Sequence, residues 1–172
     1  MPVFTVIAHD EFVAQVHALA TALSADAGWA PSFLIGIGRG GLAPAVYLSH
    51  ATGLPMLSVD HSSKVEDFAD APLQRLAERT RRGERLLLID DINDSGATIG
   101  RLRDALAEAG ALPGSVRFAT LIDNERSSQK VDYRARMIDR RVTKDWFVFP
   151  WEAVAPGSAI ERDAAEVPER IA

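Results

Sequence analysis

The chain has 172 residues, of which 24 are acidic and 19 are lysine or arginine, so its formal charge at pH 7 is −5. This balance argues against nucleic acid as a partner, because domains that bind nucleic acid carry a basic excess that neutralises phosphates. Hydrophobic residues make up 47% of the sequence and charged residues 25%, which is typical of a globular protein long enough to bury one core. The composition therefore favours a single folded domain over a disordered chain or a coiled coil.

The absence of cysteine restricts the possible chemistry. A chain without cysteine has no disulfide, no thiolate ligand for zinc or an iron–sulfur cluster, and no cysteine nucleophile. Its longest apolar runs, such as residues 42–48, are too short to cross a bilayer, and its first three residues lack the basic start of a signal peptide. We therefore expect a cytoplasmic protein with no membrane partner, in which carboxylates, hydroxyls, backbone amides or bound ions perform the chemistry.

Strand and helix patterns alternate along most of the chain. Asp10 is the expected N-cap of a first helix over residues 11–25. Strands are then expected at residues 33–37, 55–59, 86–89 and 116–122, and helices at residues 42–51, 72–82 and 99–109. This alternation predicts an α/β fold with a mostly parallel central sheet flanked by helices on both faces. In such folds, ligands bind outside the carboxyl ends of the strands.

The remaining segments have weaker patterns. Residues 61–71 are polar and without periodicity, which predicts a loop. Residues 133–150 contain two short aromatic or β-branched runs, which predict a small antiparallel C-terminal flap. From residue 153 onward the chain is rich in Ala, Glu, Arg and Pro. We therefore expect residues 1–152 to form one domain that includes the flap, and residues 153–172 to form a peripheral tail.

The strongest chemical signal follows the apolar strand that ends at Ile89. Asp90 and Asp91 come directly after this strand, and the run from Asp94 to Thr98 then opens a helix with small residues. Such residues let an anion approach the backbone, and the free N–H groups of a helix start attract a phosphate. Paired carboxylates suit sugar hydroxyls or Mg²⁺, which proteins often hold with one or two carboxylates plus substrate oxygens. The loop therefore predicts a sugar-phosphate site rather than an ordinary acidic turn.

The run from Leu87 to Thr98 resembles the motif with which type I phosphoribosyltransferases bind phosphoribosyl pyrophosphate (PRPP). The resemblance covers residues 1–152. It implies the fold of that family, with a small hood, and the transfer of ribose 5-phosphate from PRPP to a nucleobase with release of pyrophosphate. It also implies that Asp90 and Asp91 bind the ribose hydroxyls and, directly or through water, the cofactor Mg²⁺. Asp94 would be the catalytic acid or base near N7 of a purine. The 5′-phosphate would be bound by Asp94, Ser95, Gly96, Ala97 and Thr98.

A glycine-rich segment follows the strand that ends at Ile37. Residues 36–41 match the pattern Gly-x-Gly-x-x-Gly, and Asp60 lies near where a dinucleotide-binding fold places its ribose-binding acid. A dinucleotide-binding protein is therefore one alternative, and a purely structural turn is another. The phosphoribosyltransferase hypothesis gives both loops a task, because the resemblance implies that pyrophosphate is held by Arg39, Gly40 and Gly41. It also implies a strained peptide before Arg39, for which the cis form is one option.

The segment from Trp146 to Glu152 and the glycine-rich run are most similar to bacterial and archaeal 6-oxopurine enzymes, such as xanthine-guanine and hypoxanthine phosphoribosyltransferases. This similarity implies a purine-like base that stacks on Trp146 and Phe147, although these rings also suit a core or dimer-interface cluster. Those enzymes usually bond purine O6 with a lysine, whereas this chain has Asn124 at about that position, and an amide can donate or accept. The identity of the base therefore stays open, with two further candidate donors in Lys130 and Lys144.

The same resemblance concerns movement, assembly and activity. It implies that the polar segment at residues 62–68 closes over the reacting centre, where exclusion of water would protect a cationic sugar-like transition state. An ordinary solvated loop is the alternative. The resemblance also implies a homodimer or a higher homo-oligomer. An enzyme of nucleotide salvage is the first functional hypothesis, and a regulator that senses PRPP or a nucleotide without catalysis is the second.

Overall fold

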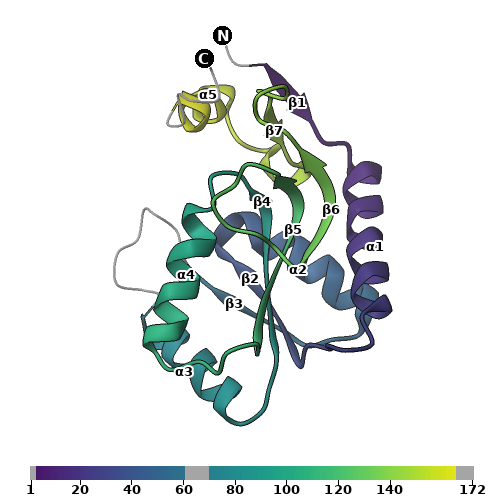
Figure 1. Cartoon of the computed structure of the whole chain (residues 1–172). Coiled ribbons are helices and arrows are strands. Elements are labelled where there is room, and N and C mark those ends of the chain that lie inside the picture. Colours follow the sequence, from purple (N-terminus) through teal and green to yellow (C-terminus); the bar gives the residue numbers. More distant parts are fainter. Residues whose placement is uncertain (1–2, 61–69, 166–172) are drawn as a thin grey trace.

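The computed structural model describes residues 3–60 and 70–165, and its centre is a sheet of five parallel strands (Figure 1). In spatial order these strands are β3 (Met56–Val59), β2 (Phe33–Ile37), β4 (Leu86–Asn93), β5 (Val116–Asn124) and β6 (Tyr133–Ile138). The strand β4 is therefore central, with two strands on either side of it.

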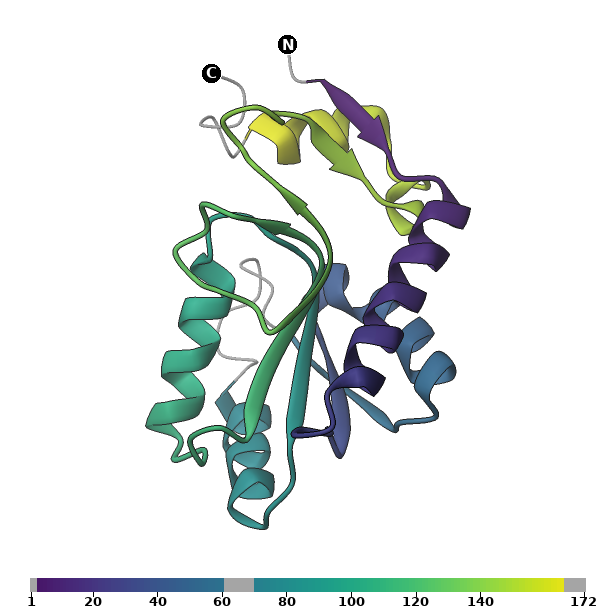
Figure 2. The same ribbon diagram turned by 45° about the vertical axis from the view of Figure 1, so that its right-hand side comes forward.

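Helices cover both faces of this sheet (Figures 1 and 2). They are α1 (His9–Ala25) and α2 (Gly38–Thr52) on one face, and α3 (Asp70–Arg81) and α4 (Ala97–Glu108) on the other. Because alternate residues of a strand point to opposite faces, Leu87 and Ile89 pack in the core under α1 and α2. Leu86 and Leu88 pack in a second core under α3 and α4. The predicted α/β fold, with helices on both faces of a parallel sheet, is thereby confirmed.

A second, smaller sheet lies beyond the carboxyl ends of the central strands. It pairs β1 (Phe4–Val6) with β7 (Trp146–Val148) in parallel. A short 3-10 turn, η1 (Pro150–Glu152), follows β7 and leads to α5 (Gly157–Ala165). In Figure 2 the small sheet and α5 form a layer above the central sheet. No helix within the described ranges is long and apolar enough to cross a membrane.

The prediction of an antiparallel flap at residues 133–150 is wrong. Its first run forms β6, which joins the central sheet parallel to β5, and its second run forms β7, which pairs with β1. Short strand patterns show that a segment is extended but not which strand it pairs with. That choice depends on residues far away in the sequence, such as Phe4 opposite Trp146.

The N-terminal segment differs from the prediction in two ways. The helix α1 begins at His9 after the N-cap residue Ala8, so Asp10 lies in the first turn, where its charge favours the helix dipole. The strand β1 was not predicted, because its three residues, although aromatic or β-branched, form a run too short to indicate a strand. Its pairing with β7 supplies the order that its sequence lacks.

The strand β4 is longer than predicted, and this difference matters for function. It continues beyond Ile89 because Asp90, Ile92 and Asn93 still pair with residues of β5. The acids that follow the apolar run are therefore held in the sheet rather than in a loop. The helix α4 begins at Ala97, two positions before its predicted start at residue 99.

The glycine-rich segment packs directly on β4 at Gly41. A Cβ atom added to this residue would lie 2.0 Å from the carbonyl oxygen of Ile89 and 3.2 Å from the Cα of Asp90. Both atoms belong to the backbone, so no side-chain rotation relieves the clash. The first turn of α2 can therefore approach the end of β4 only with glycine at this position.

We expect Gly41→Ala to lower the free energy of unfolding by about 3 kcal/mol or more, because overpacking against backbone forces the helix away from the sheet. Gly157→Ala is the matched control, since nothing lies within 4 Å of its added Cβ. It should change stability by no more than about 0.5 kcal/mol. Urea unfolding measures both variants, and equal midpoints for them would contradict the packing argument.

Candidate active site

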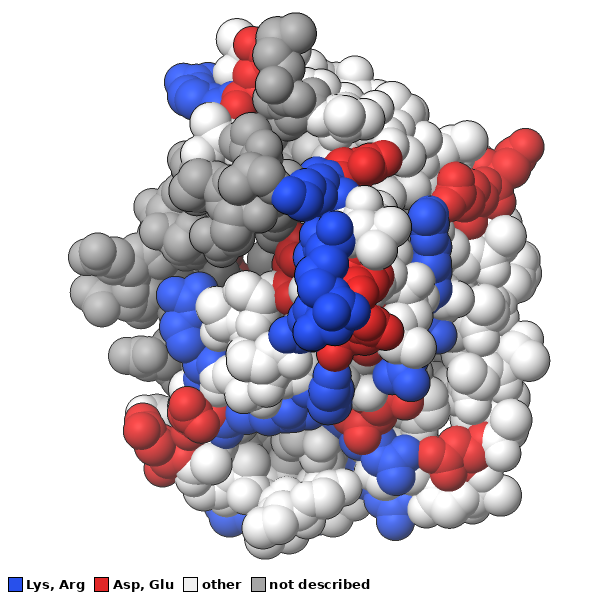
Figure 3. Space-filling view, turned by 45° about the horizontal axis from the view of Figure 1, so that its top comes forward, with Lys and Arg blue, Asp and Glu red and all other residues white. Residues whose placement is uncertain are grey.

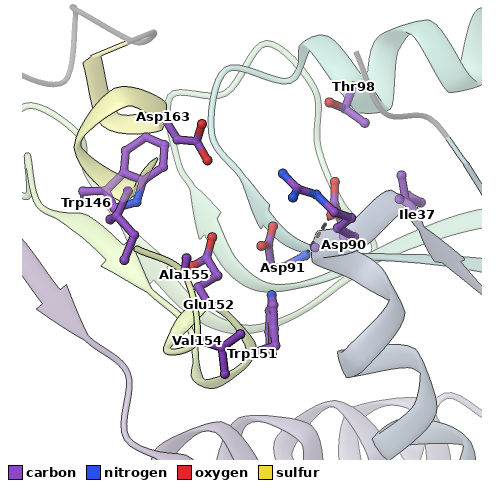
Figure 4. Close-up of a pocket in the computed structure, with 14 residues that line it drawn as sticks. Ile37, Asp90, Asp91, Thr98, Trp146, Trp151, Glu152, Val154, Ala155 and Asp163 are labelled. Carbon is purple, nitrogen blue, oxygen red and sulfur yellow. Dashed lines mark hydrogen bonds between the residues drawn. The ribbon is translucent and has the colours of Figure 1, made fainter. Parts of the chain in front are cut away.

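The carboxyl ends of β2 and β4 open into a cavity of about 520 Å³ (Figure 4). Figure 4 shows Trp146 and Asp163 on one side of this space and Ile37 and Thr98 on the other, with Asp91 between them. The cavity is lined by Ile37, Gly38, Arg39, Gly40, Asp90, Asp91, Thr98, Trp146, Trp151, Glu152, Val154, Ala155, Ile160 and Asp163. The structure thus brings both predicted loops and the predicted aromatic segment to one place.

Two smaller cavities, each of about 210 Å³, share lining residues with the first. One of them is lined by the continuous run from Asp90 to Ile99. The other is lined by Asp91, Ile92, Arg140, Trp146, Phe147, Phe149 and Glu152. Asp91 lines all three cavities, so a helix start, a glycine loop with an arginine, and an aromatic wall meet around one carboxylate.

The glycine loop reaches the cavity through Arg39 and Gly40. A Cβ atom added to Gly40 would lie 2.7 Å from a carboxylate oxygen of Asp91, so glycine lets the loop approach the acid directly. Gly41 lies behind it, against β4. The peptide before Arg39 is trans, since residues 3–60 and 70–165 contain no cis peptide bond. Gly38 has a φ of +51°, in the left-handed region that favours glycine, so the cis option is wrong.

The acid pair lies in the cavity wall at the end of β4. The backbone amide of Asp91 donates to Oδ1 of Asp90 at 3.0 Å, and the amide of Ile92 donates to Oδ1 of Asp91 at 2.7 Å. Burial raises the pKa of Asp90 well above its usual range, and the charge of Asp91 adds to this effect. Burial raises the pKa of Asp91 to about 6, and the charge of Glu152 adds to it. Neither carboxylate has an ion-pair partner in the described part of the chain.

The donor set at this wall fits a magnesium ion. Two neighbouring carboxylates, Asp90 and Asp91, which form no ion pair with another described residue, face a cavity large enough for a ligand. Among the residues with described positions, no group of three or more His, Cys, Asp or Glu side chains converges as a closed metal cage. Mg²⁺ suits such an open arrangement, because proteins commonly hold it with one or two carboxylates and leave the other positions to substrate oxygens and water.

The predicted phosphate loop connects β4 to α4. Gly96 has a φ of +88° and is the N-cap residue of α4, and the Ser95 hydroxyl accepts a hydrogen bond from the Ala97 amide at 3.3 Å. Thr98 lines both the cavity of about 520 Å³ and the smaller one next to it that residues 90–99 line. The helix start therefore presents backbone N–H groups and a hydroxyl to the cavity, as binding of a phosphate requires.

The segment after β5 supports this loop. The sequence analysis predicted the loop but missed this support. The amide and the hydroxyl of Ser128 both donate to the carbonyl of Ser95, at 3.1 and 2.7 Å. The buried Asn93 amide donates to Asp123 at 2.8 Å and accepts from the Ser127 hydroxyl at 2.9 Å. In the sequence, the only sign of such a network is that polar residues follow two of the predicted strands. Which of these residues bond to each other is visible only in the folded structure.

Asp94 is held by an arginine that the sequence analysis did not single out. The Nε atom of Arg140 lies 3.0 and 3.1 Å from the two carboxylate oxygens of Asp94, and Nη2 lies 2.8 Å from Oδ2. Both side chains are 11% exposed. Arg140 comes from the segment between β6 and β7, which contains several basic residues, so no local pattern distinguished it from its neighbours.

Asn124 is buried and supports the site from behind. Its amide nitrogen donates to the carbonyl of Asp94 at 2.9 Å, and its side-chain oxygen accepts from the backbone amide of Arg140 at 3.3 Å. It lines none of the three cavities. The geometry thus makes Asn124 a link between two backbones and gives no support to its predicted contact with a base. Lys130 donates to the carbonyl of Glu125 instead of reaching the site.

The two predicted stacking residues differ in their surroundings. Trp146 is partly exposed and lines both the cavity of about 520 Å³ and the smaller cavity that Phe147 and Phe149 also line, here called the aromatic cavity. Phe147 is 6% exposed and belongs to the core beneath α1. The guanidinium carbons of Arg136 and Arg140 lie 5.5 and 5.2 Å from the centre of its ring. Trp146 therefore presents a face to a ligand, whereas Phe147 mainly supports arginine side chains.

The segment after residue 152 also lines the site over its described part. Val154, Ala155, Ile160 and Asp163 line the cavity of about 520 Å³, the last two from α5. The predicted tail thus contains a short helix over its described part, which the low periodicity of the sequence concealed. Burial raises the pKa of Glu152, and the charge of Asp163 adds to this effect. Residues 166–172 and the predicted hood at 62–68 lie outside the described residues.

The raised pKa values predict how stability depends on pH. The folded protein keeps protons on Asp90 and Asp91 at pH values where the unfolded chain has lost them, so the free energy of unfolding falls as the pH rises from 3.8 through about 6. The protein without ligand should lose about 1–3 kcal/mol between pH 5.5 and 7.5. The Asp90→Asn, Asp91→Asn double variant should lose much less. Urea unfolding at both pH values measures this loss, with Asp104→Asn on the exposed face of α4 as control. An unchanged slope in the double variant would contradict the assignment.

Comparison with known proteins agrees with this geometry. The chain is 26% identical over 125 residues to the xanthine-guanine phosphoribosyltransferase of Idiomarina loihiensis, which covers 69% of this chain and 70% of that protein. It is 28% identical over 122 residues to the enzyme of the same name from Nitratidesulfovibrio vulgaris, which covers 70% of this chain and 68% of that protein. The crystal structure of a purine phosphoribosyltransferase from Pyrococcus horikoshii is 24% identical and has a TM-score of 0.62, covering 88% of this chain and 96% of that one. This last likeness shows a common fold.

The family model for the phosphoribosyl transferase domain matches residues 5–155. The matched region contains the glycine loop, the acid pair, the helix start and the aromatic wall that meet at the cavity. Sequence and geometry therefore agree over most of the chain, and the protein belongs to the phosphoribosyl transferase domain family.

Proposed function

We propose that the protein is a Mg²⁺-dependent phosphoribosyltransferase of nucleotide salvage, which transfers the ribose 5-phosphate of PRPP to a purine base and releases pyrophosphate. The observation that carries this proposal is the position of Asp91, which lines three adjoining cavities. Their walls are a helix start, a glycine loop with an arginine, and an aromatic surface. These walls suit the 5′-phosphate, the pyrophosphate and the base, with the ribose between them.

In this proposal each loop binds one part of PRPP. The 5′-phosphate accepts hydrogen bonds at the start of α4, from the backbone of residues 95–98 and the hydroxyl of Thr98. The ribose hydroxyls donate to Asp90 and Asp91. Arg39 and the backbone at Gly40 hold the pyrophosphate, because both face the cavity beside the acid pair.

The chemistry follows from charge. Departure of pyrophosphate leaves positive charge on the anomeric carbon, which the carboxylates of Asp90 and Asp91 stabilise from the ribose side. Arg39 neutralises the leaving group. Mg²⁺, when bound at the acid pair, would supply further neutralisation of the phosphate oxygens. Asp94, near N7 of the purine, accepts the N7 proton that the base loses as its N9 bonds to the anomeric carbon.

The class of base is inferred from the relatives and from the aromatic wall. The two enzymes reported above are named for xanthine and guanine, which are 6-oxopurines. Trp146 offers a partly exposed ring at the mouth of the aromatic cavity, where a planar base can stack. We therefore propose a 6-oxopurine as the acceptor.

Measuring transfer to a panel of purine and pyrimidine bases tests this proposal. With PRPP and Mg²⁺, pyrophosphate should be released with guanine, hypoxanthine or xanthine, and much more slowly with adenine, uracil or orotate. Removal of Mg²⁺ by EDTA should abolish the release, and added Mg²⁺ should restore it. No release with any base, together with a rise in melting temperature on addition of PRPP, would favour a regulator instead. A rise with NAD(H) but not with PRPP would favour a dinucleotide-binding protein.

The role of Asp94 has a separate test. Asp94→Asn should lower turnover with the best base by about 10²–10⁴-fold, because general acid–base catalysis contributes that much. Binding of PRPP, followed by thermal shift, should change little, since the acid pair and the helix start remain. Asp104→Asn, on the exposed face of α4, should behave as wild type. Unchanged turnover in Asp94→Asn would remove Asp94 from the reaction.

A further inference from the structure

Arg140 differs from the other arginines of its region. Figure 3 shows basic side chains beside acidic ones near the centre of the face that carries the carboxyl ends of the strands. In this region Arg126, Arg134, Arg136 and Arg141 also pair with acids, but their own side chains are 42–65% exposed. Arg140 is 11% exposed and pairs with Asp94, which is equally buried. Exposed arginines help to keep a protein in solution, but this role does not explain an arginine that is buried beside a cavity.

Local structure holds the guanidinium group of Arg140 in one orientation. Its Nη1 donates to the carbonyls of Thr143 and Asp145, at 3.1 and 2.7 Å. Its Nε and Nη2 donate to Asp94, and the Phe147 ring lies beneath it. A guanidinium has five N–H donors, of which these contacts use four. One N–H of Nη2 thus has no acceptor among the residues whose positions are described.

Arg140 also lines the aromatic cavity beside Trp146. The other polar residues of that wall are Asp91 and Glu152, so Arg140 is the one basic residue among those that line this cavity in the described structure. Asn124, at the end of β5, does not line this cavity, and its side chain bonds the backbones that carry Asp94 and Arg140. The cavity therefore has a single cationic donor, and a buried amide keeps that donor beside the predicted catalytic acid.

The donor of Arg140 and the acceptor of Asp94 together match the hydrogen-bonding groups on one edge of a particular class of base. In a 6-oxopurine, the carbonyl O6 and the nitrogen N7 lie side by side on the same edge, and the first accepts while a protonated second donates. Arg140 supplies a donor and Asp94 an acceptor, also side by side, and a carboxylate has enough lone pairs to accept a further hydrogen bond while Arg140 holds it. We propose that Arg140 is the residue that selects the 6-oxo group, by donating Nη2–H to O6 while Asp94 faces N7.

This inference rests on the proposed function and adds the determinant of base choice. A 6-amino group turns its own donors toward Arg140, and two buried donors that face each other leave both unsatisfied. A base with hydrogen at position 6 leaves Arg140 without an acceptor. Discrimination therefore comes from a side chain between β6 and β7 rather than from the end of β5.

The experiment compares hypoxanthine with unsubstituted purine, which differ in the 6-oxo group and the N1 proton, in wild type and in Arg140→Met. In wild type, kcat/KM should favour hypoxanthine by at least 10-fold. In Arg140→Met, this ratio should fall by about 10–100-fold, since one good hydrogen bond to a base edge supplies that discrimination. Arg140→Lys, which keeps a cationic donor, should retain part of the ratio.

Arg136→Met is the matched control, because its guanidinium also lies over the Phe147 ring but pairs with Glu11 and lines no part of the cavity. It should keep the wild-type ratio. Binding of PRPP by each variant, followed by thermal shift, shows that the fold and the phosphate loop are intact. If Arg140→Met does not fold, two other results test the proposal. They are the wild-type preference for hypoxanthine over purine and the partial loss of that preference in Arg140→Lys.

An equal loss of kcat/KM for both bases would overturn the proposal, because it would mean that Arg140 acts only by positioning Asp94. A wild-type ratio near one would overturn it as well. Absence of transfer to every base in the wild-type protein is a different result, which would overturn the proposed function and this inference together. A selective loss for hypoxanthine in Arg140→Met, without loss of PRPP binding, would support both.

Discussion

The close approach of the glycine loop to the end of β4 is the constraint on which the site depends. Gly41 touches the backbone of Ile89, and Gly40 touches the carboxylate of Asp91, at distances that leave no room for a side chain. The helix α2 can therefore begin directly beside the acid pair, which brings Arg39 to the same cavity. A bulkier loop would hold Arg39 away from the carboxylates of Asp90 and Asp91, so the two loops would no longer line one cavity.

This approach has an electrostatic cost. Asp90 and Asp91 lie half-buried next to each other, and partial burial raises the pKa of both. A ligand that brings hydroxyl donors, or a divalent cation, relieves the cost, so the site binds a partner at the expense of the stability of the empty protein. Sites that keep charges without partners often trade stability for function in this way. The buried hydrogen bonds of Asn93 help to hold the end of the strand in place against that repulsion.

The part of the site that is proposed to bind the base is built from other elements. It depends on β7, which pairs with β1 above the central sheet, and on the segment that carries Arg140. The ion pair of Arg140 with Asp94 joins this upper layer to the phosphate loop, and Asn124 ties both backbones to the end of β5. Asp94 and Arg140, the proposed catalytic acid and the proposed contact to the base, are thus coupled mechanically, because neither can move without disturbing the other.

The sequence by itself determined the alternation of strands and helices, the turn of small residues that opens α4, and the pair of acids before it. Each of these is encoded within a run of about a dozen residues, where periodicity and turn residues act locally. It did not reveal that β4 extends through Asp90, that β7 pairs with β1, or that α5 lines the cavity. It also did not single out Arg140, which lies 46 positions from Asp94. Only the tertiary structure decided these features, because pairing and burial depend on contacts between distant segments, about which a local pattern carries no information.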